Sequence, residues 1–343
     1  MKKKVITLLK VLGILLLLFI VFRLFGPTWT PSIKGANSIS ELKKVTINGT
    51  ELAVMIRGAD KSNPVLLFVH GGPCCSEIPY VRKYQESLEK NFTVVHYDQR
   101  GSGKSYRFGT DYSEVMTATH TEDLIALTEY ITEALETEQV ILLGHSFGTY
   151  IATMAAAQRP ELYRAYVGIG QMSDTVASEL SSLEKCILAA EEAGNETDVT
   201  YLKGMEEAII KGETIAPRAY VRKYGFAARE ISENGDYMKG FLFGPEYNLM
   251  DMIRFYTAVI KYQDALTKEA LKHPITDAVT ELNLPVYFVM GAYDGMTSPE
   301  TAEAYLQSLT GEGVKEFVLF EASAHYPQFE EEETFARWME EIR

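Results

Sequence analysis

A serine lies at the centre of the pentapeptide 144–148, Gly-His-Ser-Phe-Gly, which matches the pattern G-x-S-x-G. A strand-like apolar run leads into the motif and a helix-like stretch leaves it. A sharp turn between a strand and a helix is the setting in which such a serine acts as a nucleophile, and the flanking glycines relieve crowding where the backbone is strained. The motif and its context therefore predict that Ser146 is a catalytic nucleophile.

A serine hydroxyl attacks a carbonyl only when a base removes its proton, and that base needs an orienting carboxylate. His325 follows the last strand-like run of the chain, and Asp294 follows the run before it. Glu321 is a rival carboxylate, but it lies only four residues before His325, and we expect it to be solvated. The chain order Ser146, Asp294, His325 is the order of α/β-hydrolases, so it predicts a Ser-His-Asp triad.

The oxyanion that forms during such an attack needs backbone N–H groups aimed at it. Phe147, the residue after the nucleophile, supplies one of them. The loop after the strand-like run 65–69 has the sequence His-Gly-Gly-Pro-Cys-Cys, starting at His70. Proline has no N–H, so the second donor is Gly72 or, as the less favoured choice, Cys74. We expect an oxyanion hole formed by Gly72 and Phe147.

The elements that must position these residues follow from the hydrophobic pattern. Two strand-like runs flank Asn48-Gly49, a strong hairpin signal. Continuous apolar runs then alternate with amphipathic helical stretches, which is typical of a mostly parallel sheet buried on both faces. From about 172 to 279 the pattern is only helical and loop-like. The chain therefore predicts the α/β class, with an α/β-hydrolase fold: a mostly parallel sheet flanked by helices, with an inserted helical cap.

The N-terminal segment differs from the rest in charge and hydropathy. Residues 1–34 contain six basic and no acidic side chains, so the other 309 residues carry a charge of −20 within the total of −14. Residues 5–25 are almost entirely apolar and, as a helix, span roughly the 30 Å of a bilayer core. The lysines at 2–4 favour a cytoplasmic N-terminus. We expect an uncleaved signal anchor, a single transmembrane helix, with the catalytic domain extracytoplasmic and 26–40 as a stalk.

Two other interpretations of that segment remain open. A cleaved secretory signal would look similar, although no small-x-small cleavage site follows within a few residues, and a buried helix of a soluble protein is the third interpretation. The expected organisation has four parts: a signal anchor with the start of the stalk (1–34), the first part of the hydrolase core (35–171), the helical cap (172–279) and the second part of the core (280–343).

Composition excludes several other classes of protein. The 33 basic side chains are outnumbered by 47 acidic ones, which argues against a nucleic-acid binder. Three cysteines are too few for a disulfide scaffold, and we expect Cys74 and Cys75 to line the pocket rather than form a vicinal disulfide or a reactive thiol site. No HExxH, CxxC or P-loop spacing is present, so we expect neither a metal nor a cofactor.

Three motifs together carry a resemblance to a known family. The HGGP loop, the octapeptide DQRGSGKS at 98–105 and the G-x-S-x-G motif occur at spacings that resemble the proline iminopeptidase branch of the α/β-hydrolases, over essentially residues 43–343. The resemblance implies an enzyme that removes an N-terminal residue, typically proline, from short peptides. Two positions depart from the family pattern: Cys74 replaces the last glycine of HGGPG, and Phe147 stands where iminopeptidases commonly have tryptophan.

The resemblance also implies that cap carboxylates bind the free amine of the substrate. The family motif Gly-Pro-(Asn)-Glu-aromatic is matched at 244–247, which makes Glu246 the candidate, while Glu213 and Glu230 are nearby options for a second carboxylate. An esterase or lipase-like hydrolase of small acyl esters or amides is the first alternative function, and the role of Glu246 discriminates between them. A non-catalytic cell-surface binding module is the second alternative, against which the full set of catalytic residues argues.

Overall fold

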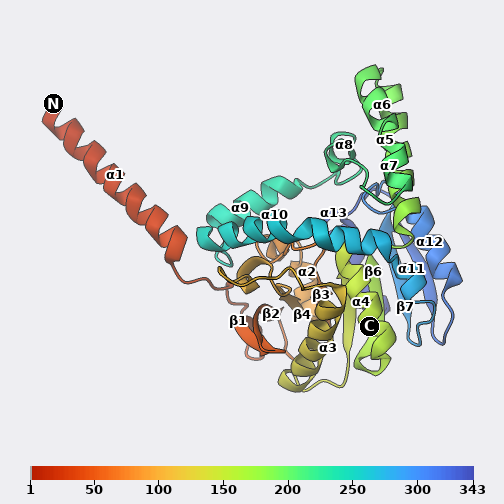
Figure 1. Ribbon diagram of the computed structural model, residues 1–343. Coiled ribbons are helices and arrows are strands. Elements are labelled where there is room, and N and C mark those ends of the chain that lie inside the picture. The colour runs from red at the N-terminus through yellow and green to blue at the C-terminus, as the bar shows by residue number, and fades with distance from the viewer. Residues whose placement is uncertain (1) are drawn as a thin grey trace.

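The computed structural model describes residues 2–343, and an eight-stranded sheet runs through the body of the protein (Figure 1). The strand order is β1-β2-β4-β3-β5-β6-β7-β8. β2 pairs with β1 and β4 in antiparallel fashion, and the other neighbours are parallel, so the predicted mostly parallel sheet is confirmed. The strands are β1 (Ile39–Ile47), β2 (Thr50–Gly58), β3 (Val65–Val69), β4 (Thr93–Tyr97), β5 (Val140–His145), β6 (Tyr163–Ile169), β7 (Val286–Gly291) and β8 (Lys315–Phe320).

The turn between β1 and β2 forms where the sequence predicts a hairpin. Asn48 and Gly49 both have positive φ, 45° and 74°. Positive φ at both central positions is the requirement of a type I′ turn, whose twist matches that of the two strands it joins.

Helices cover both faces of the sheet. Alternate residues of β3 show this, because Leu66 and Phe68 pack on one face with α2 and α14, whereas Leu67 and Val69 pack on the other with α3 and α4. Successive side chains of a strand point to opposite faces, so a strand covered on both sides is a continuous apolar run. The covering helices are α2 (Glu86–Asn91), α3 (Thr117–Ala134), α4 (Phe147–Gln158), α12 (Pro299–Ser308), α13 (Pro327–Glu330) and α14 (Glu332–Glu341).

Between β6 and β7 the chain forms helices and loops that lie over one end of the sheet (Figure 1). We call this segment, 175–278, the cap. Its longest helix begins at a capping box, in which the side chains of Asn248 and Asp251 bond each other's backbone N–H groups. The cap helices are α5 (Thr175–Glu192), α6 (Glu196–Lys203), α7 (Glu206–Ile210), α8 (Arg218–Lys223), α9 (Glu233–Phe243), α10 (Leu249–Lys272) and α11 (Ile275–Ala278).

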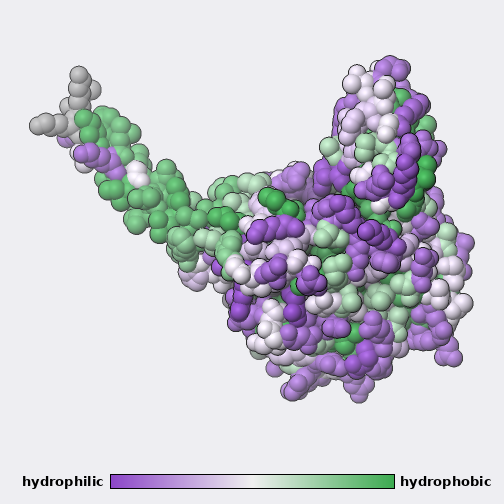
Figure 2. Space-filling model, viewed as in Figure 1, coloured by the Kyte–Doolittle hydropathy of each residue, from purple (hydrophilic) through white to green (hydrophobic). Residues whose placement is uncertain are grey.

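The N-terminal helix α1 (Lys2–Phe25) projects from the body, and its surface is almost wholly apolar (Figures 1 and 2). An 18-residue part of Lys4–Phe25 has a mean hydropathy of 3.0, and none of that part is buried inside the protein. α1 is the one helix within residues 2–343 that is long and apolar enough to cross a membrane, a property that N-terminal signal sequences share.

The segment that follows α1, expected as a stalk at 26–40, is docked against the body. The backbone N–H of Trp29 donates to the carbonyl of Pro245 at 3.0 Å, and Lys104 Nζ donates to Thr28 Oγ1 at 2.8 Å. The Thr30 hydroxyl is buried against the Arg57 guanidinium at 2.6 Å. These bonds hold the segment against the cap and the sheet over most of its length, until it enters β1. The segment is rich in Pro, Gly and Ser because its backbone is irregular, and these contacts fix it to the body.

Candidate active site

Ser146 occupies the turn between β5 and α4. Its backbone has φ 53° and ψ −126°, a region that side chains rarely adopt, and its N–H donates to the carbonyl of Ile169 at 2.9 Å. The turn is tight enough that a Cβ at Gly148 would lie 2.1 Å from the carbonyl oxygen of Val69. Glycine is therefore required there for steric reasons, and the turn aims the serine away from the sheet as the motif predicts.

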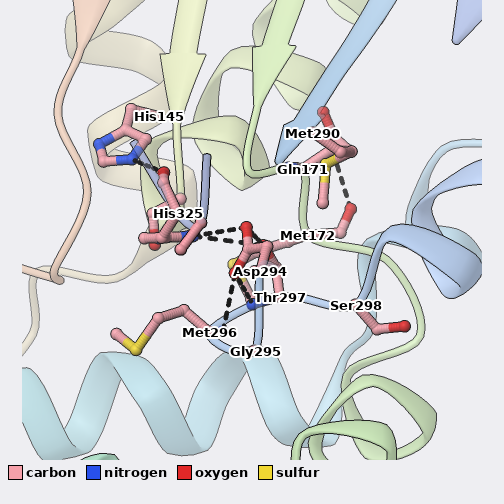
Figure 3. Close-up of polar contacts among 12 residues, drawn as sticks. His145, Gln171, Met172, Met290, Asp294, Gly295, Met296, Thr297, Ser298 and His325 are labelled. Atoms are coloured by element: carbon pink, nitrogen blue, oxygen red, sulfur yellow. Dashed lines mark hydrogen bonds and ion pairs between the residues drawn. The ribbon is translucent and has the colours of Figure 1, made fainter. Parts of the chain in front are cut away.

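Asp294 and His325 lie in the loops that follow β7 and β8, and a direct hydrogen bond joins them (Figure 3). His325 Nδ1 is 2.8 Å from Asp294 Oδ2, and both side chains are buried. The N–H groups of Met296 and Thr297 donate to Asp294 Oδ1 at 2.8 and 3.0 Å, and the Thr297 hydroxyl donates to Oδ2 at 2.9 Å. Burial alone would raise the pKa of Asp294, but His325 and these donors hold that pKa below its ordinary value.

One cavity of about 450 Å³ brings Ser146 and His325 together. His325 Nε2 is buried and has no hydrogen-bond partner within the described part of the chain. A ring whose Nδ1 is bonded to a carboxylate, whose Nε2 is unpaired and which shares a cavity with a serine is suited to serve as a general base. Ser146, Asp294 and His325, which lie far apart in the sequence, thus converge on one site.

The HGGP loop forms the wall of the cavity next to the serine. The lining residues include Gly71, Gly72, Cys75 and Phe147. Cys74 does not line the cavity. A Cβ at Gly71 would lie 2.7 Å from the Ser146 Cβ, so the glycine permits the loop to approach the serine closely. Gly72 has φ 119°, and a Cβ there would lie 2.6 Å from the Cys75 nitrogen. Of the candidate oxyanion donors, Gly72 and Phe147 therefore line the cavity and Cys74 does not.

The octapeptide 98–105 bonds both to the segment that follows the HGGP motif and to the cap. Asp98 is buried, and its carboxylate accepts hydrogen bonds from the Tyr247 hydroxyl at 2.5 Å, from the Lys104 N–H at 2.6 Å and from the Ser76 hydroxyl. Burial raises the pKa of Asp98 to about 6 against these donors. Because Ser76 belongs to the HGGP loop and Tyr247 to the cap, Asp98 ties the two together.

A second histidine–carboxylate pair, Glu77 and His145, lies in the wall of the same cavity, and no sequence motif marks Glu77. His145 Nδ1 faces the carboxylate of Glu77, and His145 Nε2 lies 3.0 Å from the main-chain oxygen of His325 (Figure 3). Burial alone would lower the pKa of His145, but the Glu77 carboxylate outweighs burial and raises it, while His145 in turn holds the pKa of Glu77 low. Both shifts favour the charged forms of the two groups.

Glu246 does not line the cavity, so the structure does not place it where the expected amine contact would form. Glu246 is buried, and its carboxylate is 2.6 Å from Arg82 Nε. A buried carboxylate needs a counter-charge, and Arg82 already supplies it. Of the two nearby options, both of which are exposed, Glu213 lines the cavity and Glu230 does not. No ion pair or side-chain hydrogen bond engages the Glu213 carboxylate within residues 2–343.

The sheet order, the serine turn after β5 and the loops after β7 and β8 define an α/β-hydrolase. Residues 64–198 match the family described as "alpha/beta hydrolase fold". The chain is 31% identical over 304 residues to the probable aminopeptidase YbaC of Bacillus subtilis (strain 168), covering 87% of this chain and 95% of that protein. It belongs to the α/β-hydrolase family, in the proline iminopeptidase-like branch.

Two further comparisons agree with this assignment. The proline iminopeptidase of Heyndrickxia coagulans is 27% identical over 277 residues, covering 79% of this chain and 87% of that protein. The crystal structure of the proline iminopeptidase of Mycobacterium smegmatis has a TM-score of 0.63 at 16% identity, covering 88% of this chain and 98% of that chain. At that identity the structural likeness shows the shared fold.

Proposed function

We propose that this hydrolase is a membrane-anchored serine aminopeptidase that releases N-terminal residues from short peptides. The observation that carries the chemistry is the 2.8 Å bond between Asp294 and His325, whose free Nε2 lines the same cavity as Ser146. The names of the relatives YbaC and proline iminopeptidase support the choice of peptide substrates.

In the proposed reaction, His325 Nε2 takes the proton of the Ser146 hydroxyl as its oxygen attacks the carbonyl of the N-terminal residue. The N–H groups of Gly72 and Phe147 stabilise the negative oxygen of the tetrahedral intermediate. The imidazolium, held by Asp294, then protonates the leaving amine, and an acyl-enzyme forms on the serine. Water attacks this ester with the same nitrogen as base, which releases the amino acid and regenerates Ser146.

The charge of the cavity favours a substrate that carries an ammonium group. Five carboxylates line it against three side chains of lysine and arginine: Glu77, Glu179, Glu213, Glu233 and Asp264 against Arg218, Arg222 and Lys268. Four of the five have an ionic partner: Glu77 pairs with His145, Glu179 with Arg218, Glu233 with Arg222 and Asp264 with Lys268. Glu213 is the lining carboxylate without an ionic partner inside the described chain. We assign amine recognition to Glu213, because it is the lining carboxylate left free to pair with a substrate ammonium.

The proposed location follows from α1 and the three lysines at 2–4. Positive residues stay on the cytoplasmic side of a spanning helix, which leaves the hydrolase body on the extracytoplasmic side. Intact-mass measurement of the purified protein and labelling of cells with a membrane-impermeant amine reagent test this topology. A mass that lacks the first 25 residues or so would identify a cleaved signal instead.

The activity is tested by assaying the full-length enzyme against amino-acyl arylamides with free and N-acetylated amines. Free-amine substrates should be turned over and acetylated ones should not, and Ser146→Ala should abolish both turnover and labelling by a serine-reactive phosphonate. A second candidate, hydrolysis of small acyl esters, is favoured by the apolar part of the wall, which includes Met172, Val259 and Leu271. Equal turnover of acetylated substrates and short esters would favour this candidate over the aminopeptidase.

A further inference from the structure

The end of α1 is fixed to the corner between α9 and α10. Arg23 Nη2 donates to the carbonyls of Phe241, Gly244 and Tyr247 at 2.8, 3.0 and 2.8 Å, and the Arg23 side chain is buried. The Asn248 amide donates to the carbonyl of Gly26 at 3.1 Å. No flexible linker therefore separates the helix from the body. Wherever α1 enters a bilayer, the α9–α10 corner must lie at the bilayer surface.

The same corner exposes large apolar side chains. On α10, Ile253, Tyr256 and Ile260 recur at spacings of three and four, so they form one stripe along the helix. Phe243 and Ile260 expose 73% and 81% of their surface, values that soluble proteins rarely allow for side chains of this kind. The α9–α10 patch, as we call it, consists of Trp29, Met238, Phe243, Ile253, Tyr256 and Ile260.

The members of the patch belong to one surface, and that surface adjoins the anchor. The Tyr256 hydroxyl is 3.9 Å from the Met238 sulfur, which joins the α9 and α10 parts. Trp29 is bonded through its backbone to Pro245, in the loop that connects these two helices. Figure 2 shows the apolar surface of α1 continuing onto green and pale-green parts of the body where α9 and α10 lie. The anchor and the patch are thus continuous.

The charges beside the patch have the sign that suits phospholipid headgroups. Lys239 follows Met238 and Lys261 follows Ile260, and both lysines are exposed without an ion-pair partner in the described structure. A helix surface with large apolar residues and flanking lysines is the composition of segments that lie in a membrane interface. Exposed tryptophan and tyrosine side chains are also typical of the membrane–water interface.

From these observations we infer that the α9–α10 patch is seated in the headgroup region of the phospholipid bilayer that α1 crosses. The inference rests on the proposed membrane topology and is independent of the aminopeptidase assignment. Its consequence reaches the active site, because α10 also contributes Val259 and Gln263 to the cavity wall. The bilayer therefore holds one side of the helix whose other side contacts the substrate.

Depth-dependent quenching of tryptophan fluorescence tests this inference. The full-length protein is reconstituted in vesicles of phosphatidylcholine and phosphatidylglycerol, with native Trp29 and Trp338 replaced by phenylalanine and one tryptophan introduced. The test variants are Phe243→Trp and Ile260→Trp, and the matched control is Leu319→Trp, an exposed apolar position on β8. Leu15→Trp reports insertion of α1 itself. Brominated phosphatidylcholine should quench the tryptophans at 243, 260 and 15 and spare the one at 319.

Each other outcome has a distinct meaning. Quenching at 15 without quenching at 243 and 260 overturns the docking of the cap while leaving the anchor in place. A blue-shifted but unquenched tryptophan at 260 shows that a protein surface, such as a second copy of the chain, covers the patch, and it also overturns the inference. Absence of quenching at 15 overturns the topology together with this proposal. Loss of arylamide turnover with normal quenching concerns the proposed activity alone.

Discussion

His145 Nε2 lies 3.0 Å from the main-chain oxygen of His325, so the residue before the proposed nucleophile holds the backbone of the proposed base. The other ring nitrogen of His145 faces the Glu77 carboxylate. The His325 main-chain oxygen accepts from Nε2–H, and an ionised Glu77 carboxylate accepts from Nδ1–H, so an imidazolium ring satisfies both partners. This agrees with the raised pKa of His145. The buried Glu77–His145 pair therefore positions the loop of His325.

Removal of either member of that pair should be strongly destabilising. Glu77→Gln or His145→Gln leaves a buried partner without its counter-charge, and we expect a loss of about 3–5 kcal/mol in the free energy of unfolding for each. The double variant should lose less than the sum, as measured by denaturant unfolding of the detergent-solubilised enzyme. Additive losses would show that the two side chains are not coupled.

The coupling of Glu77 and His145 should also depend on pH. The folded pKa of Glu77 is lowered, so its contribution is present above the ordinary value of 4.5 and is lost as pH falls through the folded pKa. The folded pKa of His145 is raised, so its contribution is present below 6.5 and is lost as pH rises through the folded pKa. The coupling energy between Glu77 and His145 should therefore be largest between pH 4.5 and pH 6.5. A coupling that does not change with pH would exclude ionisation of the pair.

Asp294→Asn should reduce kcat by roughly four orders of magnitude with little change in KM, because the histidine loses the partner that selects its tautomer. The matched control is Thr297→Val, which removes the hydroxyl donor at 2.9 Å but keeps the two backbone N–H donors. Thr297→Val should reduce kcat much less than Asp294→Asn does. Steady-state kinetics of both variants decide the point, and an Asp294→Asn enzyme of near-normal kcat would refute the assigned role.

Glu213→Gln and Glu246→Gln should affect different properties. Hydrogen bonds to charged groups contribute about 1.5–3 kcal/mol, so Glu213→Gln should raise KM for free-amine arylamides roughly ten- to hundredfold without lowering Tm. Glu246→Gln should lower Tm, since it leaves Arg82 without the buried carboxylate, and should leave KM unchanged. The exposed Glu230→Gln variant is the control for both. A KM effect confined to Glu246→Gln would restore the contact that the sequence motif implies.

Arg23→Ala should loosen the anchor from the cap. It removes three hydrogen bonds from a charged donor to the α9–α10 corner, and each bond of this kind contributes about 1.5–3 kcal/mol. Trypsin should then cleave faster after the exposed Lys34 in reconstituted vesicles. Lys10→Ala, on the apolar helix away from the body, is the control and should not alter that rate. Unchanged cleavage after Lys34 in the Arg23 variant would contradict a structural role for the contact.

The sequence by itself determined the fold and the order of the proposed catalytic residues. Continuous apolar runs arise because both faces of each central strand are buried, and positive φ at Asn48 and Gly49 is a local requirement. The serine turn is likewise local, since one strand, one turn and one helix define it. Such patterns depend on neighbours in the chain and can be recognised without the tertiary structure.

Only the tertiary structure decided which carboxylate faces the cavity and where the anchor rests. Glu246 pairs with Arg82, 164 residues away, and Glu77 pairs with His145, 68 residues away, so no local pattern distinguishes a paired carboxylate from a free one. The segment after α1 has the composition of a stalk, yet long-range hydrogen bonds to the cap fix it in place. A buried charge is stabilised by whatever counter-charge the fold brings to it, and that partner is a property of the packing.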